Sequence, residues 1–371
     1  MKNKCINQQD IKQANASDVF NIIRKNGALT RSQLQDITNL SWGAISNIVA
    51  RLSEDKYIVE TKADRGSGAG RIPSYLEVNS FDHFIIGLDI NASGFKAVLM
   101  NLKNEVVNRY FKEPSYVDKA SMLAELFEFV GDVLSGAKGY NILCVGVAMQ
   151  GLVDSQNGIS IQGPMLEDWE EVPLARLLEE KIKIPVYLEH DPDCSLYAFS
   201  IKSKLSDALL IRIDKGIGMS VMQNGEIYKR IGMFELGHIV VVPNGEKCVC
   251  GKRGCLQAYA SQAGLSAGSG LPFETLVENA RKGEEKAVEL FKNMAEHLAR
   301  EISNISHLLC INNIVLCGDM WNYRDVFAPE FAKKLADYGA GDLNLIIAET
   351  EHAARGAAFI AIERFLEKFK F

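Results

Sequence analysis

The sequence predicts an α/β protein in which a winged helix-turn-helix precedes a body of two lobes. Residues 17–79 show three short helical patterns followed by two alternating strands, which is the order of a winged helix-turn-helix. Residues 84–112 and 207–228 repeat one plan, a buried strand and a turn followed by further strands. We therefore expect residues 1–80 to form one domain and the rest of the chain to form a body of two similar parts.

The composition is that of an ordinary globular protein. The 371 residues are enough for several buried cores, and 47% of them are hydrophobic while 24% are charged. The first residues, MKNKCINQQDIK, lack the apolar core of a signal peptide, and no apolar run is long enough to span a membrane. We therefore expect a cytoplasmic protein with reduced cysteines and no membrane partner.

Charge differs between the two ends of the chain. Residues 1–80, called the head below, contain 11 Lys and Arg against 8 Asp and Glu, a net charge of +3. The remaining residues contain 30 against 39, a net charge of −9, and the two parts sum to the −6 of the whole chain. A mildly basic head on an acidic body favours contact with nucleic acid through the head alone.

The head is predicted to contain three helices, each preceded by a capping residue. Ser17 is expected to cap the first helix, which ends before Gly27. Thr30 and Ser41 are expected to cap the second and third helices, because their hydroxyls can accept an unpaired backbone N–H. The third helix has one apolar stripe at helical spacing, formed by Ile45, Ile48, Val49 and Leu52.

The other face of the third helix has short polar side chains that suit the major groove of DNA. YIVET and SYLEV alternate like the strands of a wing, and the RGSGAGRIP segment between them brings an arginine suited to the minor groove. A packing or dimerisation module is the alternative interpretation of the head. The residues expected to contact DNA are Arg31, Ser41, Trp42, Gly43, Ser46, Asn47, Arg51 and Arg71.

A cluster of cysteines follows the second repeat, in the stretch GHIVVVPNGEKCVCGKRGC. Three thiolates and one imidazole are a complete tetrahedral donor set for zinc, of the closed kind that leaves no position for catalysis. We therefore predict a structural zinc ion, with three ordinary buried thiols and a histidine as the alternative. The expected ligands are His238, Cys248, Cys250 and Cys255.

The spacing H-x9-C-x-C-x4-C also resembles the zinc loop of the ROK family, which contains sugar-responsive repressors, uncharacterised reading frames and sugar kinases. The resemblance extends over most of the chain beyond the head. It implies that the body has the duplicated, ribonuclease H-like, actin-like fold of the ROK sugar kinases, with a sugar bound between the lobes. It also implies that residues 81–190 together with 351–371 form the first lobe, and that residues 191–350 form the second. With a head before the body, the chain resembles the repressor branch of the family, which includes the xylose repressors.

The loops that hold ATP phosphates in the family's kinases differ here. The kinases have a DxGxT loop whose backbone N–H groups bind phosphate, whereas this chain has side chains at Asn91 and Ala92. Ser220 stands where a small glycine is common, and Asp319 follows the glycine of a later loop. Because an aspartate repels a polyphosphate, we expect no ATP binding and no enzyme activity.

The sugar-facing segments resemble the family more closely. LCVGVAMQGLVDSQNG resembles its glycine-and-VD segment, and YLEHDPDCSL resembles its E-N-D-x-N motif with Asp191 in place of the kinase base. In a repressor this vestigial base binds a sugar hydroxyl without deprotonating it. In GMFELGH, the histidine that binds zinc through one ring nitrogen faces the sugar with the other. The implied sugar site consists of Gly151, His190, Asp191, Glu235, His238 and Gln257.

Two further features of the body bear on its packing. Trp169 is expected either to line the sugar cleft or to lie in the core, since a tryptophan suits both positions. The residues after Pro272, from Glu274 to Leu309, are amphipathic and are expected to form one long helix.

These features together predict a transcriptional repressor that binds operator DNA and responds to a sugar or a sugar phosphate. A homodimer or homotetramer is expected, because two-fold symmetric proteins match palindromic operators. One alternative is a ROK-type ATP-dependent sugar kinase with an accessory DNA-binding head. Another is a DNA-bound module that answers to a protein partner. The sequence does not name the sugar.

Overall fold

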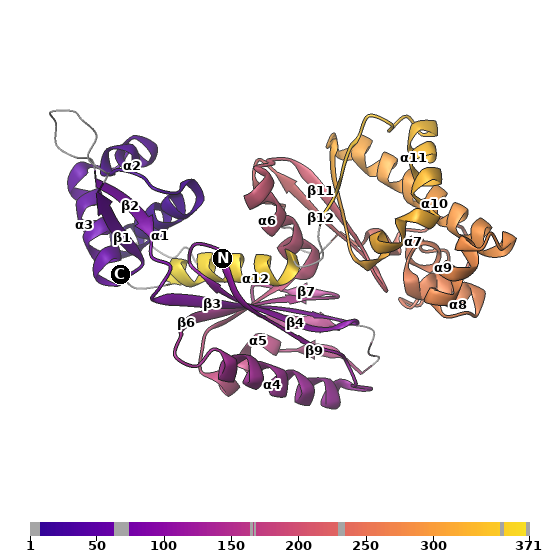
Figure 1. The fold of residues 1–371 in the computed structure, drawn as a ribbon, viewed down its shortest axis with the longest axis horizontal. Coiled ribbons are helices and arrows are strands. Elements are labelled where there is room, and N and C mark those ends of the chain that lie inside the picture. The colour runs from indigo at the N-terminus through magenta and orange to yellow at the C-terminus, as the bar shows by residue number, and fades with distance from the viewer. Residues whose placement is uncertain are drawn as a thin grey trace. The chain divides into compact units, whose positions relative to one another are not determined.

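The computed structural model describes residues 8–62, 74–163, 166, 168–228, 234–348 and 352–368. The chain divides into two compact units, Met1–Glu189 with Ala357–Phe371, and His190–Gly356 (Figure 1). The first unit contains the head and most of the predicted first lobe, without residues 190 and 351–356. The second unit begins one residue before, and ends six residues after, the predicted second lobe of residues 191–350.

The head has the predicted order of elements: α1 (Gln8–Asn26), α2 (Arg31–Thr38), α3 (Trp42–Glu54), β1 (Ile58–Lys62) and β2 (Ser74–Val78). The two strands pair antiparallel, as expected for a wing. Thr30 caps α2 in a capping box with Gln33, and the Ser41 hydroxyl accepts the N–H of Ala44 at the start of α3. The buried residues of α3 are Ile45, Val49 and Leu52, while Ile48 is half-buried.

The prediction that Ser17 caps the first helix is wrong. Helix α1 begins at Gln8, and Ser17 is a buried residue inside it. The preceding residues, QQDIKQANA, contain neither glycine nor proline and favour a helix, so no residue interrupts the helix before Ser17. The helix ends as predicted before Gly27, whose φ of 81° is left-handed.

The first lobe is built on a sheet of five strands in the order β10-β6-β3-β4-β5. Its central strand, β3, is buried along its whole length. It pairs antiparallel with β4 and parallel with β6. A small second sheet has the order β7-β8-β9. The elements are β3 (His83–Asn91), β4 (Gly94–Asn101), β5 (Val106–Lys112), α4 (Lys119–Gly136), β6 (Asn141–Met149), β7 (Val153–Asp154), β8 (Ile159–Gln162), β9 (Glu170–Val172), α5 (Leu174–Ile182) and β10 (Val186–His190).

The second unit repeats this sheet, with the order β13-β12-β11-β14-β15. In both sheets an antiparallel hairpin is followed along the chain by strands parallel to its first strand, so the predicted repeat of one strand plan is confirmed. The strands are β11 (Ala208–Ile213), β12 (Ile217–Gln223), β13 (Glu226–Ile227), β14 (Asn313–Cys317) and β15 (Asn344–Ile347).

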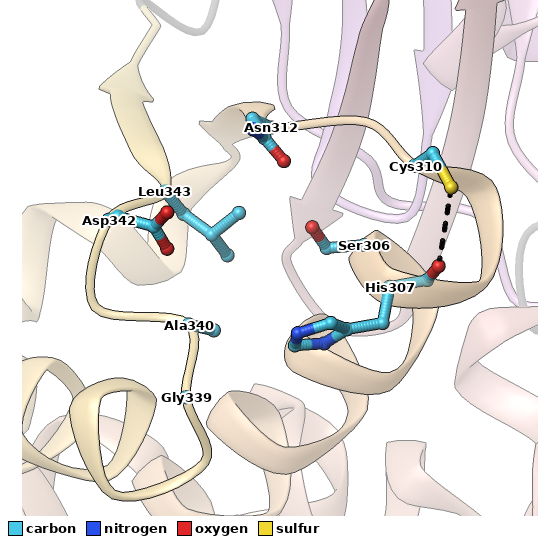
Figure 2. Close-up of a pocket in the computed structure, with 8 residues that line it drawn as sticks. All are labelled: Ser306, His307, Cys310, Asn312, Gly339, Ala340, Asp342 and Leu343. Carbon is cyan, nitrogen blue, oxygen red and sulfur yellow. Dashed lines mark hydrogen bonds between the residues drawn. The ribbon is translucent and has the colours of Figure 1, made fainter.

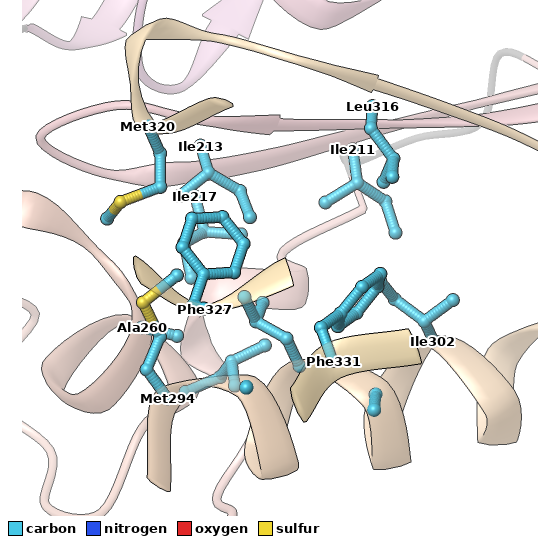
Figure 3. Packing of buried hydrophobic residues seen from close by; sticks show 14 of the residues in the cluster. Ile211, Ile213, Ile217, Ala260, Met294, Ile302, Leu316, Met320, Phe327 and Phe331 are labelled. Atoms are coloured by element: carbon cyan, nitrogen blue, oxygen red, sulfur yellow. The ribbon is translucent and has the colours of Figure 1, made fainter. Parts of the chain in front are cut away.

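Helices pack on this second sheet and close its core. Figure 3 shows Phe327 and Phe331 between Ile211 of the sheet and the residues Met294 and Ile302 of the longest helix, all of them buried. The helices are α6 (Asp191–Ser203), η1 (Leu236–His238), α7 (Leu256–Ala260), α8 (Gln262–Ser269), α9 (Phe273–Arg281), α10 (Glu285–Leu309), η2 (Asp319–Val326) and α11 (Ala328–Asp337).

The expectation of one long helix after Pro272 is wrong, because the structure has α9 and α10 there. The break lies at Gly283, whose φ of 81° is left-handed and ends α9. Glu284 then starts α10 by accepting the N–H of Ala287 with its side chain. Of the two positions open to Trp169, the structure has the core of the first lobe, where its indole N–H donates to Ser160.

The last helix, α12 (His352–Lys368), returns to the first unit from residue 357 onward. It packs closely on β6, because a Cβ at Gly146 would lie 2.0 Å from the carbonyl oxygen of Ala357. It also contacts the head, since the buried guanidinium of Arg24 in α1 donates to Glu363 at 3.0 Å. Among the described residues, no helix has both the length and the apolar character needed to cross a bilayer.

Candidate functional site

Residues 238–255, called the knuckle below, form a compact loop in the second unit between η1 and α7. His238 is the last residue of η1, and Cys255 is the residue that precedes α7. The knuckle is folded back on itself by the N–H of Cys248, which donates to Lys252 at 2.9 Å. Gly254 is required there, since its φ is 78° and a Cβ would lie 1.8 Å from the carbonyl oxygen of Val242.

The fold brings together the four residues predicted to bind zinc, and their ligand atoms all lie within 4.8 Å of one another. The Sγ atoms of Cys250 and Cys255 are 3.7 Å apart, and Nδ1 of His238 is 3.5 Å from Sγ of Cys248. Tetrahedral zinc, with its usual bonds to sulfur and nitrogen, requires separations of about 3.8 and 3.6 Å for such pairs. The cluster can therefore hold a metal ion, and its dimensions suit zinc.

The thiols of the knuckle are chemically unequal. Burial raises the pKa of Cys255 to about 12, and the neighbouring thiols add to this rise. Burial also raises the pKa of Cys248. At Cys250 burial acts in the same direction, but hydrogen bonds from the backbone N–H of Lys252 and from the two other thiols, with the charge of Lys252, together outweigh it, so its pKa is lowered. Because neighbouring thiolates repel one another, a bound cation is needed for all three to be ionised together.

The second ring nitrogen of His238 is directed toward Glu235, an amino acid of the predicted sugar site. Since Nδ1 faces the thiols, Nε2 is the nitrogen that lies 3.8 Å from the carboxylate of Glu235. Gln257, on the helix that follows Cys255, accepts the N–H of Ile217 at 3.2 Å. Its amide oxygen therefore helps hold β12 in place, a role that the sequence did not indicate.

A group of charged side chains lies where β10 ends and α6 begins. Asp191 is buried, and its carboxylate is 3.4 Å from the guanidinium of Arg212. Asp193 accepts the hydroxyl of Ser220 at 2.6 Å. Arg212 is the one charged residue in the apolar strand ALLIRI, and that isolation was the available signal for a role that sequence reasoning missed.

His190 is buried beside these carboxylates. Burial alone would lower the pKa of its imidazole, but Asp193, Asp191 and Glu235 outweigh this effect, so the pKa is raised. Its ring nitrogens lie 3.9 Å from Asp191 and from Asp193, and Nδ1 has no hydrogen-bond partner in the part of the chain that the structure describes. The buried imidazole of His190 is therefore stabilised mainly by the negative charges of the carboxylates around it.

Gly151 is the remaining amino acid of the predicted sugar site. It belongs to the first unit, whereas the other five site residues belong to the second. It follows β6 with a φ of 97°, and a Cβ there would lie 2.3 Å from the carbonyl oxygen of Gln162. A glycine is thus required for the local chain path.

Side chains at two hairpin turns are already paired with backbone N–H groups, either of the turn itself or of a neighbouring loop. In the turn after β3, the N–H of Ala92 donates to the side chain of Gln150 at 2.7 Å, and the N–H of Ser93 donates to Asn91 at 2.8 Å. In the turn after β11, Asp214 accepts the N–H of Asp319. The same carboxylate pairs with Nε of Arg212 at 2.6 Å.

The predicted DNA-contacting residues of α3 are largely accessible: Trp42, Gly43 and Asn47 are exposed, and Trp42 is 54% exposed. Two predicted arginines have partners inside the head. Arg31 donates both terminal nitrogens to Glu60 of β1, at 2.8 and 2.9 Å, and Nε of Arg51 lies 2.9 Å from Asp55.

The other polar residues of this set differ in their availability. Ser46 is half-buried, and the hydroxyl of Ser41 is used in capping α3. The arginine of the predicted wing, Arg71, lies outside the described residues.

A polar pocket of about 350 Å³ lies elsewhere in the second unit, and none of the predicted site residues lines it. Figure 2 shows Ser306 and His307 of α10 on one side and Asp342 and Leu343, before β15, on the other. The exposed thiol of Cys310 contacts the carbonyl oxygen of His307 at 3.7 Å. The ring of His307 is already engaged through Nδ1 by the carbonyl oxygen of Ser303, at 2.7 Å.

Comparison with known proteins identifies the family of the chain. The model of the ROK family matches residues 85–364, and a model described as winged helix-turn-helix DNA-binding matches residues 15–59. The xylose repressor of Caldicellulosiruptor bescii is 27% identical over 265 residues, which are 69% of this chain and 65% of that protein. The transcriptional repressor Mlc of Escherichia coli is 24% identical over 341 residues, which are 86% of this chain and 84% of that protein.

Solved structures agree on the fold. A ROK family transcriptional regulator, described as a homolog of Mlc, matches with a TM-score of 0.80 and 21% identity, over 96% of this chain and 97% of its own. Sugar kinases of the family are also among the matching structures. The predicted α/β fold, a winged helix-turn-helix followed by the two-lobed ROK fold, is thereby confirmed. Because the family model covers most of the sequence, the chain belongs to the ROK family and has a winged helix-turn-helix DNA-binding head.

Proposed function

We propose that this protein is a sugar-responsive transcriptional repressor. The observation that supports this most strongly is the accessible face of α3, with Trp42, Gly43 and Asn47, on the head of a ROK body. The relatives that match most of this chain include proteins named xylose repressor and DNA-binding transcriptional repressor Mlc. The protein binds operator DNA as a symmetric dimer or a tetramer, with α3 in the major groove and Arg71 in the minor groove.

The proposed effector is a sugar or a sugar derivative. Asp191 and Glu235 offer carboxylates for sugar hydroxyls, and His238 offers Nε2 while Nδ1 binds the metal. His190 and Gln257 complete the set in the second unit. The proposed metal is zinc, in a structural role, because its four ligands leave no position for a substrate.

Kinase activity is not part of the proposal. The N–H groups of Ala92 and Ser93 are the donors that a phosphate would need, and both are paired with side chains of the chain itself. In the turn after β11, the carboxylate of Asp214 accepts the N–H of Asp319 from the loop after β14. This carboxylate also adds negative charge, which disfavours a phosphate. No turnover of ATP is therefore expected with any hexose or pentose. Sugar phosphorylation above background, absent in Asp191→Asn, would support the kinase alternative.

DNA binding is tested by selecting sites from a random DNA library with the full-length protein. Enrichment of a palindromic sequence is expected, because the two heads of a symmetric dimer read equivalent half-sites. Asn47→Ala should weaken binding to that sequence about tenfold, since a bidentate base contact contributes about 1–3 kcal/mol. Asn108→Ala, an exposed asparagine of β5, is the matched control. Failure to enrich any sequence would contradict the proposal.

Sugar response is tested with a panel of sugars and sugar phosphates, using thermal shift and then operator affinity. A ligand of the folded protein raises its melting temperature by mass action. Glu235→Gln should reduce this shift while leaving operator affinity without sugar unchanged. A response to none of the sugars, together with specific DNA binding, would favour the module that answers to a protein partner.

A further inference from the structure

The three cysteines of the knuckle differ in their access to solvent. Cys248 and Cys255 are buried, whereas Cys250 is exposed. It follows Val249, which is 69% exposed, and precedes Gly251, where an added Cβ would meet no other atom within 4 Å. Oxidants react with thiolates that solvent can reach, so Cys250 is the point at which an oxidant would meet this site.

A second thiol is placed to complete the reaction. Sγ of Cys255 lies 3.7 Å from Sγ of Cys250, and four residues separate the two in sequence. A disulfide needs an S–S distance of about 2.05 Å, so the two sulfurs must approach by less than about 2 Å. There is open space beside Gly251, the next residue after Cys250, which leaves room for this movement. Cys255 is itself buried and thus acts second.

We propose that the knuckle is an oxidant-sensitive switch, a role that rests on the proposed binding of zinc. The thiolate of Cys250 attacks hydrogen peroxide: an S–O bond forms, the O–O bond breaks, and hydroxide leaves. The thiolate of Cys255 then attacks that sulfur, forming the disulfide and releasing a second hydroxide. Two electrons pass from the two sulfurs to one peroxide, and both hydroxides take up protons to become water.

This reaction removes two of the four metal ligands, and the metal is released with them. The ligand set joins η1, which ends at His238, to α7, which begins after Cys255. In the absence of the metal, the backbone hydrogen bond from Leu256 to Ile239, at 2.9 Å, still ties these segments. This bond holds the two segments less firmly than the bond and the metal together, so oxidation loosens the segment that holds Glu235 and the protein loses its response to the effector.

The experiment treats zinc-loaded, full-length protein with hydrogen peroxide and follows zinc release with a chromophoric chelator. One zinc released per chain, together with a Cys250–Cys255 disulfide identified by peptide mass spectrometry, is the expected result. Hydrogen exchange should speed up in residues 235–239 and 256–260 and return to its initial rate after reduction and zinc addition. Cys310→Ser, which removes an exposed thiol outside the knuckle, should behave as the parent does.

A second variant separates oxidation from ligand loss. Cys250→His keeps a four-ligand set of a kind that also binds structural zinc, but it lacks the exposed thiol. It should retain zinc under the peroxide treatment that strips the parent. Retention of zinc by the parent while Cys310 is oxidised would overturn this inference and leave the zinc proposal standing. Absence of zinc from carefully purified protein would instead overturn both.

Discussion

The knuckle and the two hairpin turns are tight loops with many polar groups, but those groups are satisfied differently. In the turn after β3, Gln150 and Asn91 pair with the backbone N–H groups, and Asp214 of the turn after β11 pairs with the N–H of Asp319 in the loop after β14. In the knuckle, one imidazole and three thiols converge on a single point. The difference teaches that internal pairing closes a loop to ligands, whereas convergence of similar donors prepares a loop for an ion.

The largest effect is expected from removing the ion. Cys255→Ala, or a strong chelator, should lower the free energy of unfolding of the second unit by several kcal/mol, because binding at a structural zinc site is folding free energy. Thermal denaturation of parent and variant, with and without chelator, measures this loss. Cys310→Ala is the matched control. Equal melting temperatures with and without chelator would mean that the knuckle is held without an ion.

Asp214→Ala tests the charged turn. The change takes one partner from the buried guanidinium of Arg212 and leaves the N–H of Asp319 unpaired, so a loss of about 3 kcal/mol is expected. Denaturant unfolding gives the value. Asp214→Asn keeps an acceptor for the N–H and should lose less. If the alanine variant is as stable as the parent, the turn is not closed by this carboxylate.

Gln150→Ala makes the same test on the neutral turn. It removes the acceptor of the Ala92 N–H, which water can then replace, so the expected loss is about 1 kcal/mol. The midpoint of urea unfolding is the appropriate measurement, with Gln156→Ala as a control on an exposed loop of the same unit. A loss larger than that of Asp214→Ala would reverse the ranking of the two turns.

His190 is neither fully paired, like the groups of the turns, nor part of a ligand cluster, like the groups of the knuckle. Its Nδ1 has no hydrogen-bond partner in the described residues, and nearby carboxylates such as Asp193 stabilise its charged form. Its pKa is raised in the folded protein, so its contribution to stability is complete below the ordinary histidine pKa of about 6.5. That contribution is lost as the pH rises through the folded value. The stability difference between the parent and His190→Asn should therefore shrink from pH 5.5 to pH 8. A difference that grows with pH would contradict the raised pKa.

Sequence alone was sufficient where the physical cause is local. Thr30 and Ser41 cap their helices as predicted, and the four residues of the candidate metal cluster, which lie within 18 consecutive residues, come together as expected. The first helix and the helix break were missed because an interior serine and a helix-ending glycine, Ser17 and Gly283, can occur in either role.

Partners that are distant in sequence could not be predicted. Arg31 was expected at DNA, but it pairs with Glu60, 29 residues later, on a strand whose register had to be known. Gln150 reaches Ala92 across 58 residues, through the parallel pairing of β3 and β6. The position of such side chains follows from tertiary structure, which one sequence pattern does not specify.

The contact between α1 and α12 has a consequence for biosynthesis. Arg24 meets Glu363, and 339 residues separate them. At translation rates of roughly 5–20 residues per second, the ribosome needs on the order of tens of seconds to make the second partner after the first. A nascent head is therefore complete in sequence long before the helix that anchors it exists. Its buried guanidinium acquires that carboxylate only when nearly all of the chain has been made.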